Sequence, residues 1–310
     1  MVPQEFIQKA KNINFHLTMN KKEIIIIGKN SFISEKLVKK LIEEKVYIIK
    51  NKRNYYIKPN WFNLIKNNST IIFFAFDNDL RSQKKNFFKF NKQIFNFFNL
   101  FENYLKRKKL SPHIIFTSTV TVYGNTKFNL VDEKFTLNPQ AEYDLSKIFF
   151  EKLLLKLSIS CDIKSTILRL SNVIGFSYVS KQKNRGILNK IIKKIKKNEV
   201  VQIYGTGKYL RDYIYIDDLI DGLIKTIQKV KPGIYNLCSG KSYSLINILK
   251  KIKKKLKKEI KIKFMNFPEK SSIIEKRNFK GSNKLFAKNF KWKTKFNMDK
   301  SIIKIYEEIK

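Results

Sequence analysis

Short apolar runs alternate with longer stretches of helical periodicity through the first half of the chain. The run Glu23–Ile27 (EIIII) is unbroken and β-branched, and Gly28 ends it; such a run is typical of a strand buried on both faces. Similar runs predict further strands, and the stretches between them carry apolar residues three or four apart, which predicts helices. The expected strands are 23–27, 46–49, 70–75, 113–118 and 165–170, and the expected helices are about 33–42, 84–108 and 141–158. Strands separated by helices predict an α/β fold with a doubly wound parallel sheet, as in a Rossmann domain.

After about residue 176 the alternation of strands and helices becomes less regular. The expected elements there are a helix near 186–197, a strand over 200–204, an extended run over 212–216, a strand over 234–238, a lysine-rich helix over 245–256 and a last helix near 298–309. We therefore predict that residues 22–175 form the doubly wound domain. Residues 176–310 are expected to form a smaller lobe, with some segments that return to the sheet.

The chain is strongly basic, with 65 Lys and Arg against 25 Asp and Glu in 310 residues, a formal net charge of +40. Only seven of the basic residues are Arg, the residue that reads phosphates with a planar fork. We therefore expect a solvated lysine surface and no nucleic-acid partner. A face for nucleic acid or an anionic membrane stays open as the alternative, because residues 245–256 form an amphipathic basic helix.

Cysteine and histidine are too few for a disulfide framework or a Cys/His metal site. The chain has Cys161, Cys238, His16 and His113, so no metal is expected. No apolar run approaches the roughly 18 residues of a membrane span, and the first residues lack the pattern of a signal peptide. We expect a cytoplasmic protein without a membrane span.

Two short segments carry candidate phosphate chemistry. The turn from Gly28 to Ser34 (GKNSFIS) joins the first strand to the first helix, where a dinucleotide pyrophosphate would bind. It has only the first glycine of a GxxGxxG spacing, with Ser31 and Ser34 at the others, so an ordinary turn is an alternative. The second strand ends in Lys50-Asn51-Lys52-Arg53. These cations would suit the 2′-phosphate of NADP. In a chain with so many lysines, a chance cluster on the surface is an equally good explanation.

Tyr143 and Lys147 form the sharpest candidate pair. They lie four residues apart in YDLSK, so on a helix they share one face. A nearby ammonium favours the phenolate of a tyrosine and brings it toward acid/base use at neutral pH. Upstream, the strand over 113–118 ends in a row of hydroxyls, FTSTVTVYG.

Taken together, the motifs resemble the extended short-chain dehydrogenase/reductases, specifically the NAD(P)-dependent nucleotide-sugar epimerases and dehydratases. The resemblance covers nearly all of residues 22–310 and rests on the order of GKNSFIS, STVTVYG, YDLSK, LRLSNVIG, IYGTGKYLRDYIYIDDL, YNLCSG and a late KW. It implies a dinucleotide-binding domain over 22–175 and a substrate-binding lobe over 176–310. It also implies NAD or NADP as cofactor, a nucleoside-diphosphate sugar as substrate and a homodimer.

The resemblance assigns roles to single residues of this chain. Thr119 would hydrogen-bond the reacting sugar oxygen, Tyr143 would be the catalytic acid/base, and Lys147 would hold the nicotinamide ribose. Asn172, Arg211 and Arg277 would contact the diphosphate of the substrate, with Arg277 the less secure match, and a structural ion pair is the alternative for each arginine. Asn91 stands where the family has a helix asparagine near the active site, and an ordinary surface asparagine is the alternative there. The expected cofactor-binding residues are Gly28, Ser31, Phe32, Ile33, Lys50, Arg53, Ala75, Tyr143 and Lys147.

Departures from the family pattern narrow the function. The family's 4,6-dehydratases follow the catalytic threonine with an Asp-Glu pair, and this chain has Val120 and Thr121 there, so dehydration is not expected. A 4-epimerase that works through a transient 4-keto sugar is the favoured interpretation. A 4-keto-reductase driven by NADPH would use the same residues, and the cations after the second strand support it. The missing glycines keep a non-catalytic nucleotide-binding protein open as a third possibility.

Overall fold

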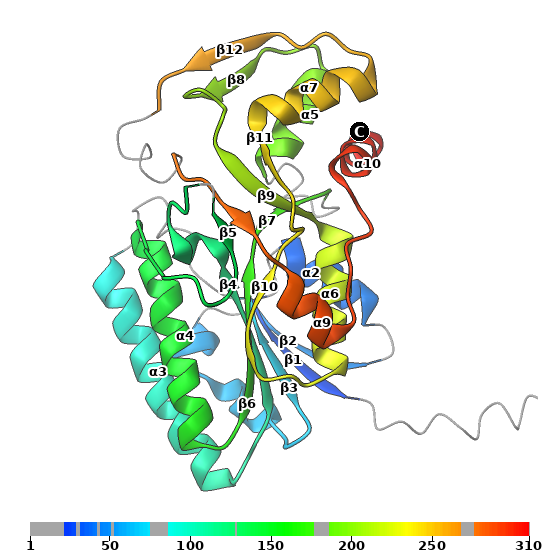
Figure 1. Cartoon of the computed structure of the whole chain (residues 1–310). Coiled ribbons are helices and arrows are strands. Elements are labelled where there is room, and N and C mark those ends of the chain that lie inside the picture. Colours follow the sequence, from blue (N-terminus) through cyan, green and yellow to red (C-terminus); the bar gives the residue numbers. More distant parts are fainter. Residues whose placement is uncertain are drawn as a thin grey trace, which may run out of the picture.

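The computed structural model describes residues 22–28, 32–41, 44–50, 53–74, 86–127, 129–176, 186–267 and 276–309. Figure 1 shows a larger lobe built on a central sheet and a smaller lobe above it, with the carboxyl end of the chain near α10. The smaller lobe lies over the carboxyl ends of the sheet strands, so the two lobes face each other across that edge.

The central sheet has six parallel strands, the architecture expected from the alternating pattern. Their spatial order is β10 (Gly233–Leu237), β6 (Lys164–Leu170), β4 (His113–Thr119), β3 (Thr70–Phe73), β1 (Glu23–Ile27) and β2 (Lys45–Ile49). β1 is buried along its whole length. The β-branched run predicted to be covered on both faces is therefore an inner strand between β3 and β2.

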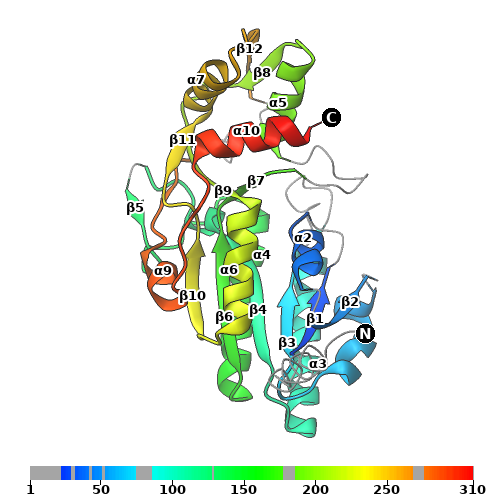
Figure 2. The same ribbon diagram turned by 90° about the vertical axis from the view of Figure 1, so that its right-hand side faces the viewer.

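Helices cover both faces of this sheet (Figures 1 and 2). Ile25 and Ile27 of β1 point into an apolar cluster shared with α3 (Phe87–Lys108) and α4 (Glu142–Ser160). Ile24 and Ile26 point the other way, into the cluster of α2 (Phe32–Lys40) and α6 (Ile216–Gln228). The two-residue period of the strand thus supplies both cores. A π-helix over Arg53–Ile57 and a 3₁₀ helix over Asn60–Leu64, which the periodicity did not predict, add aromatic rings on the α3 side.

The smaller lobe combines short strands with three helices. Its elements are α5 (Ile187–Lys196), β8 (Val201–Tyr204), α7 (Leu245–Leu256), β12 (Ile262–Met265) and α10 (Met298–Glu308). A three-stranded sheet of β7 (Asn172–Ile174), β9 (Leu210–Tyr215) and β11 (Ser242–Ser244) runs between the lobes. The pair β5 (Leu130–Val131) and β13 (Lys280–Gly281), the 3₁₀ turn Val120–Tyr123 and α9 (Lys284–Phe290) complete the described elements.

The two lobes are not continuous in the sequence. α6 and β10 come after residue 176, yet α6 packs on the central sheet and β10 extends it. The division at residue 175 stays a prediction. The lysine-rich helix α7 buries Ile248, Leu249 and Ile252 within its own lobe. Within the described part of the chain, no helix is both long and apolar enough to cross a membrane.

A buried ion pair connects the main helix α4 to the sheet. Arg169 on β6 donates to Glu151 on α4 at 2.7 Å, and both side chains are 3% exposed. Ser118 on β4 donates to the same carboxylate. Arg169 also donates to the hydroxyl of Tyr123 at 2.8 Å, and burial raises the pKa of Tyr123 to about 12, which keeps that phenol neutral. The ion pair therefore sits in a satisfied network that spans α4, β4 and β6.

Replacing one partner of this pair is expected to destabilise the fold strongly. Glu151→Gln should lower the free energy of unfolding by about 3–5 kcal/mol, because Arg169 is left buried without a counter-charge. Glu102→Gln is the matched control: Glu102 pairs with the half-exposed Lys106, and such pairs contribute less than about 1 kcal/mol. Chemical denaturation of the three proteins gives the comparison, and equal losses in the two variants would contradict the prediction.

Candidate active site

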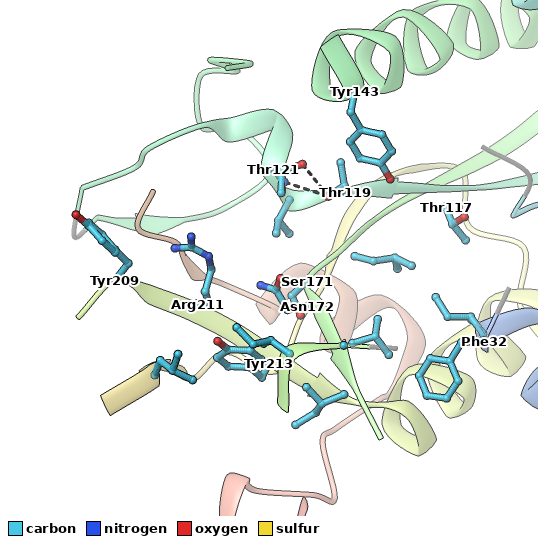
Figure 3. Close-up of a pocket in the computed structure, with 18 of the residues that line it drawn as sticks. Phe32, Thr117, Thr119, Thr121, Tyr143, Ser171, Asn172, Tyr209, Arg211 and Tyr213 are labelled. Atoms are coloured by element: carbon cyan, nitrogen blue, oxygen red, sulfur yellow. Dashed lines mark hydrogen bonds between the residues drawn. The ribbon is translucent and has the colours of Figure 1, made fainter. Parts of the chain in front are cut away.

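A cavity of about 940 Å³ lies where the two lobes meet, at the carboxyl edge of the central sheet. The start of α2 and the ends of β3, β4 and β6 form its floor, and β7, β8 and β9 form its other wall. This edge of a doubly wound sheet is the usual place for a ligand, since the loops that follow parallel strands converge there. Figure 3 shows side chains from both lobes pointing into this space.

Tyr143 and Lys147 lie in the first two turns of α4 and line this cavity. Lys147 is 3% exposed, its Nζ donates to the carbonyl of Thr117 at 2.7 Å, and it lies 5.7 Å from the centre of the Tyr143 ring. The i, i+4 spacing places the two side chains on one face, and the end of β4 anchors the ammonium there. The buried ammonium of Lys147 therefore lies next to the Tyr143 ring on this wall of the cavity.

Thr119 is the last residue of β4 and lines the same cavity as Tyr143, with its hydroxyl turned toward Thr121 (Figure 3). Its Oγ1 accepts the backbone N–H of Thr121 at 3.2 Å and lies 3.0 Å from the Thr121 hydroxyl. Thr121 in turn donates to Asp144 at 2.5 Å. The structure thus brings together the three residues expected to be catalytic.

The cofactor side of the cavity fits a dinucleotide, as far as the described residues reach. Gly28, which directly follows β1, has a φ of +101°, which glycine adopts without strain. Phe32 and Ile33, at the start of α2, line the cavity, and the N–H groups at a helix start suit a pyrophosphate. Lys50 is exposed directly after β2. Ser31, Ala75 and the side chain of Arg53 lie outside the described residues.

Two of the three residues expected to contact the substrate phosphates line the wall opposite α4. Asn172 on β7 and Arg211 on β9 line the same cavity as Thr119 and Tyr143 (Figure 3). The Asn172 amide donates to the carbonyl of Asp212 at 3.1 Å, and the Arg211 guanidinium donates to the carbonyls of Leu210 and Arg277. Backbone contacts thus hold both side chains on the wall opposite α4.

Arg277 has different surroundings from those of Arg211. Its Nη1 pairs with Asp144 at 2.7 Å and reaches the carbonyl of Thr121 at 3.3 Å. The Arg277 side chain is 9% exposed, and the residue is not among those that line the cavity. Its contact with a substrate phosphate stays a prediction. Asn91 on α3 donates to Ser146 of α4 at 3.0 Å and likewise does not line the cavity.

An aromatic rim at the far end of the cavity was missed by the sequence analysis. Tyr204, Tyr209 and Phe267 line it together with Gln202. Phe267 stacks on Tyr204 with ring centres 6.5 Å apart and lies 6.3 Å from Tyr209. A Cβ at Gly205 would come within 2.1 Å of the Phe267 ring, so this glycine makes room for the rim. The alternation of buried Val201 and Ile203 with exposed Gln202 and Tyr204 in β8 was the available signal.

Metal chemistry finds no support in the described part of the chain. Its His, Cys, Asp and Glu side chains form no group of three or more that could hold an ion. The two cysteines are free, and Cys238 is buried.

Comparison with known proteins identifies the family. The model of the NAD dependent epimerase/dehydratase family matches residues 24–238, well over half of the 310 residues. The chain therefore belongs to this NAD(P)-dependent enzyme family, as the motif order indicated.

Two relatives show the range of chemistry among similar proteins. A candidate UDP-glucose 4-epimerase of Methanocaldococcus jannaschii is 28% identical over 251 residues, which are 74% of this chain and 81% of that protein. The dTDP-4-dehydro-6-deoxyglucose reductase of Escherichia coli is 31% identical over 172 residues, 55% of this chain and 52% of the reductase. The second match thus spans about half of either protein.

Solved structures share the fold over nearly the whole chain. MoeE5 in complex with UDP-glucuronic acid and NAD has a TM-score of 0.77 at 17% identity, over 92% of this chain and 98% of its own. RMD from Pseudomonas aeruginosa, complexed with NADPH, has a TM-score of 0.75 at 16% identity with the same coverage of both chains. At these identities the likeness shows the fold alone.

Proposed function

We propose that the protein is a nucleotide-sugar 4-epimerase that works through a transient 4-keto sugar. One observation carries the proposal: Tyr143, Lys147 and Thr119 share one cavity with the start of α2 on one side and with Arg211 and Asn172 on the other. The reacting carbon of a sugar would lie between Tyr143 and the cofactor while its diphosphate extends toward Arg211. The aromatic rim at Tyr204 suits the flat face of a nucleobase.

The residues of this chain supply the proton chemistry. Tyr143 takes the proton of the sugar hydroxyl, Lys147 stabilises the resulting charge distribution, and Thr119 holds the reacting oxygen. A bound NAD would supply the hydride acceptor for the same carbon, so that a C–H and an O–H bond would break as the C=O bond forms. The ketone would then turn in the cavity and regain hydride and proton on its other face, with no net redox change. The cavity of about 940 Å³ is at the upper end of ligand pockets, which leaves room for that turn.

A one-way 4-keto-reductase is the second candidate. It would use the same Tyr143, Lys147 and Thr119, with the proton travelling from Tyr143 to the carbonyl oxygen. Its specific support is Lys50, which stands exposed after β2 where a 2′-phosphate of NADP would lie. A non-catalytic binding protein is the weakest reading, because all three expected catalytic residues converge on the cavity.

A 4,6-dehydratase is not proposed. That reaction needs an acid and a base next to the catalytic threonine. Here Val120 has no ionisable group, and the hydroxyl of Thr121 is bound to Asp144.

The catalytic assignment predicts the effect of Tyr143→Phe. Turnover of the nucleotide sugar should fall by roughly 10²–10⁴-fold, the usual contribution of a positioned acid/base, with little change in thermal stability. Tyr104→Phe on α3, outside the cavity, is the control and should keep wild-type turnover. Epimerisation followed by chromatography of the products measures both. Near-normal activity of the Tyr143 variant would refute the assignment.

Cofactor choice can be tested at Lys50. If its ammonium binds a 2′-phosphate, Lys50→Asp should weaken NADP by about tenfold or more, the scale of one lost charge-assisted contact, and change NAD much less. Lys58→Asp makes the same charge change at another exposed position and should leave the ratio of the two affinities unchanged. Calorimetric titration of the wild type and the two variants with each cofactor gives all six constants. A wild-type protein that prefers NAD would remove the reason for a phosphate role.

The phosphate role of Arg211 predicts a selective loss of substrate affinity. A diphosphate can accept two hydrogen bonds from the planar guanidinium. Arg211→Ala should therefore weaken UDP binding by about 2–3 kcal/mol while NAD(P) binding changes little. Arg107→Ala, at the exposed end of α3, removes the same charge far from the cavity. Equal losses for the two variants would mean that only net charge attracts UDP.

We also infer a homodimer and a cytoplasmic location. α3 and α4 lie side by side on the outside of the molecule (Figure 1) and expose large apolar side chains, with Phe88 at 81% and Ile159 at 86%. A second copy of the chain would cover this surface. Sedimentation should give twice the chain mass of 36.9 kDa. Free cysteines fit a reducing compartment.

A further inference from the structure

The hydroxyl of Thr119 is one end of a hydrogen-bonded chain that leads away from the cavity. Its Oγ1 lies 3.0 Å from the hydroxyl of Thr121, which donates to Asp144 Oδ1 at 2.5 Å. The other carboxylate oxygen, Oδ2, accepts from Arg277 Nη1 at 2.7 Å. Asp144 is 1% exposed. The chain therefore connects the floor of the cavity to a buried ion pair.

The ion pair decides the direction of every hydrogen bond in this chain. A guanidinium is always protonated and only donates, so the carboxylate of Asp144 only accepts. Thr121 has a single hydroxyl proton and gives it to Asp144. The Thr121 oxygen then has only lone pairs left for Thr119, so Thr119 is the donor in their contact. Since Thr119 also accepts the N–H of Thr121 at 3.2 Å, what remains for the cavity is a lone pair.

We propose that Asp144 is a positioning residue that, acting through Thr121, turns the hydroxyl of Thr119 so that in the resting site an oxygen lone pair, and not the proton, is left for the cavity that Tyr143 lines. The proposal rests on the proposed function for the roles of Thr119 and Tyr143. Rotation about one bond would let Thr119 donate instead to a phenolate or a carbonyl oxygen, at the cost of its bond to Thr121. The Thr119 hydroxyl could then accept a hydrogen bond from the sugar alcohol and donate one to the ketone, and both forms of the sugar occur in an epimerase reaction.

Other charged groups also act on Tyr143 and must be kept constant. Lys147 faces it from the same helix, Arg211 faces the cavity from β9, and the Asp144–Arg277 pair lies behind Thr119. Variants that alter only the hydroxyl of Thr121 leave all these charges in place. They are therefore the cleanest probes of the hydrogen-bond direction.

The decisive comparison is Thr121→Val against Thr121→Ser. Valine removes the acceptor for the Thr119 proton, which then points into the cavity and stabilises the Tyr143 phenolate. The pKa of Tyr143 should fall by about 0.5–1 unit, the value of one neutral hydrogen bond. Serine keeps the hydroxyl and should keep the wild-type pKa. The midpoint is read from phenolate absorbance during a pH titration of the full chain, as the difference between each protein and the same protein with Tyr143→Phe.

Asp144→Asn separates hydrogen-bond direction from charge. Arg277 can only donate, so it holds the amide oxygen, and the amide nitrogen faces Thr121. The amide nitrogen then donates to the hydroxyl oxygen of Thr121. The Thr121 hydroxyl in turn donates to Thr119, and the Thr119 proton is left to point into the cavity. The pKa of Tyr143 should again fall. Thr121→Val already removes the hydroxyl that connects Asp144 to Thr119. In that background Asp144→Asn should therefore change the pKa of Tyr143 by clearly less than it does in the wild-type protein.

The outcomes are distinct. A Tyr143 pKa unchanged in Thr121→Val overturns the proposal, as does a Thr121→Ser variant that behaves like Thr121→Val. Equal shifts from Asp144→Asn in the two backgrounds would show that Asp144 acts by charge alone and would also overturn it. None of these readings requires turnover. Failure of the wild-type protein to convert any nucleotide sugar would therefore reject the proposed function without deciding the proposal about the hydrogen bonds of Thr119.

Discussion

The buried contact between Glu151 and Arg169 is the constraint on which the geometry of the cavity depends. It fixes α4 against β6, and Ser118 of β4 donates to the same carboxylate. Tyr143, Asp144 and Lys147 all lie in the first two turns of α4, and Thr117 and Thr119 lie at the end of β4. Two charges taken out of water are held only by good geometry and full hydrogen bonding, so the helix has little freedom to slide along the sheet.

Two aspartates of this basic chain, Asp212 and Asp218, are buried and stabilise its interior through hydrogen bonds. Asp212 accepts the N–H groups of Ser239 and Gly240 at 2.8 Å each, and its complete burial raises its pKa to about 6. Asp218 accepts the N–H groups of Lys295 and Phe296 at 2.9 and 3.0 Å. Each carboxylate ties segments of the chain that lie far apart in the sequence. These two buried carboxylates thus hold loops of the chain against β9 and α6.

The two walls of the cavity impose different demands. The polar side chains of the α4 wall are almost fully buried and hydrogen-bonded. The opposite wall, with Asn172 and Arg211, comes from the short strands that run between the lobes, and these two side chains are more exposed. Under the proposed function, separate elements would therefore carry the proton chemistry and the binding of the diphosphate.

The order of strands and helices and the pairing of Tyr143 with Lys147 could be predicted from the sequence, because both depend on local periodicity. A β-branched run is buried wherever it lies in a parallel sheet, and an i, i+4 spacing shares a helix face in any fold. The partner of Arg277 could not be predicted. Asp144 lies 133 positions away, and no local pattern records which of two anionic groups, a side chain or a substrate phosphate, a guanidinium will meet. The aromatic rim of Tyr204, Tyr209 and Phe267 likewise exists only because separate turns of the smaller lobe converge over Gly205. Contacts of this kind depend on the packing of distant segments, so only the tertiary structure decides them.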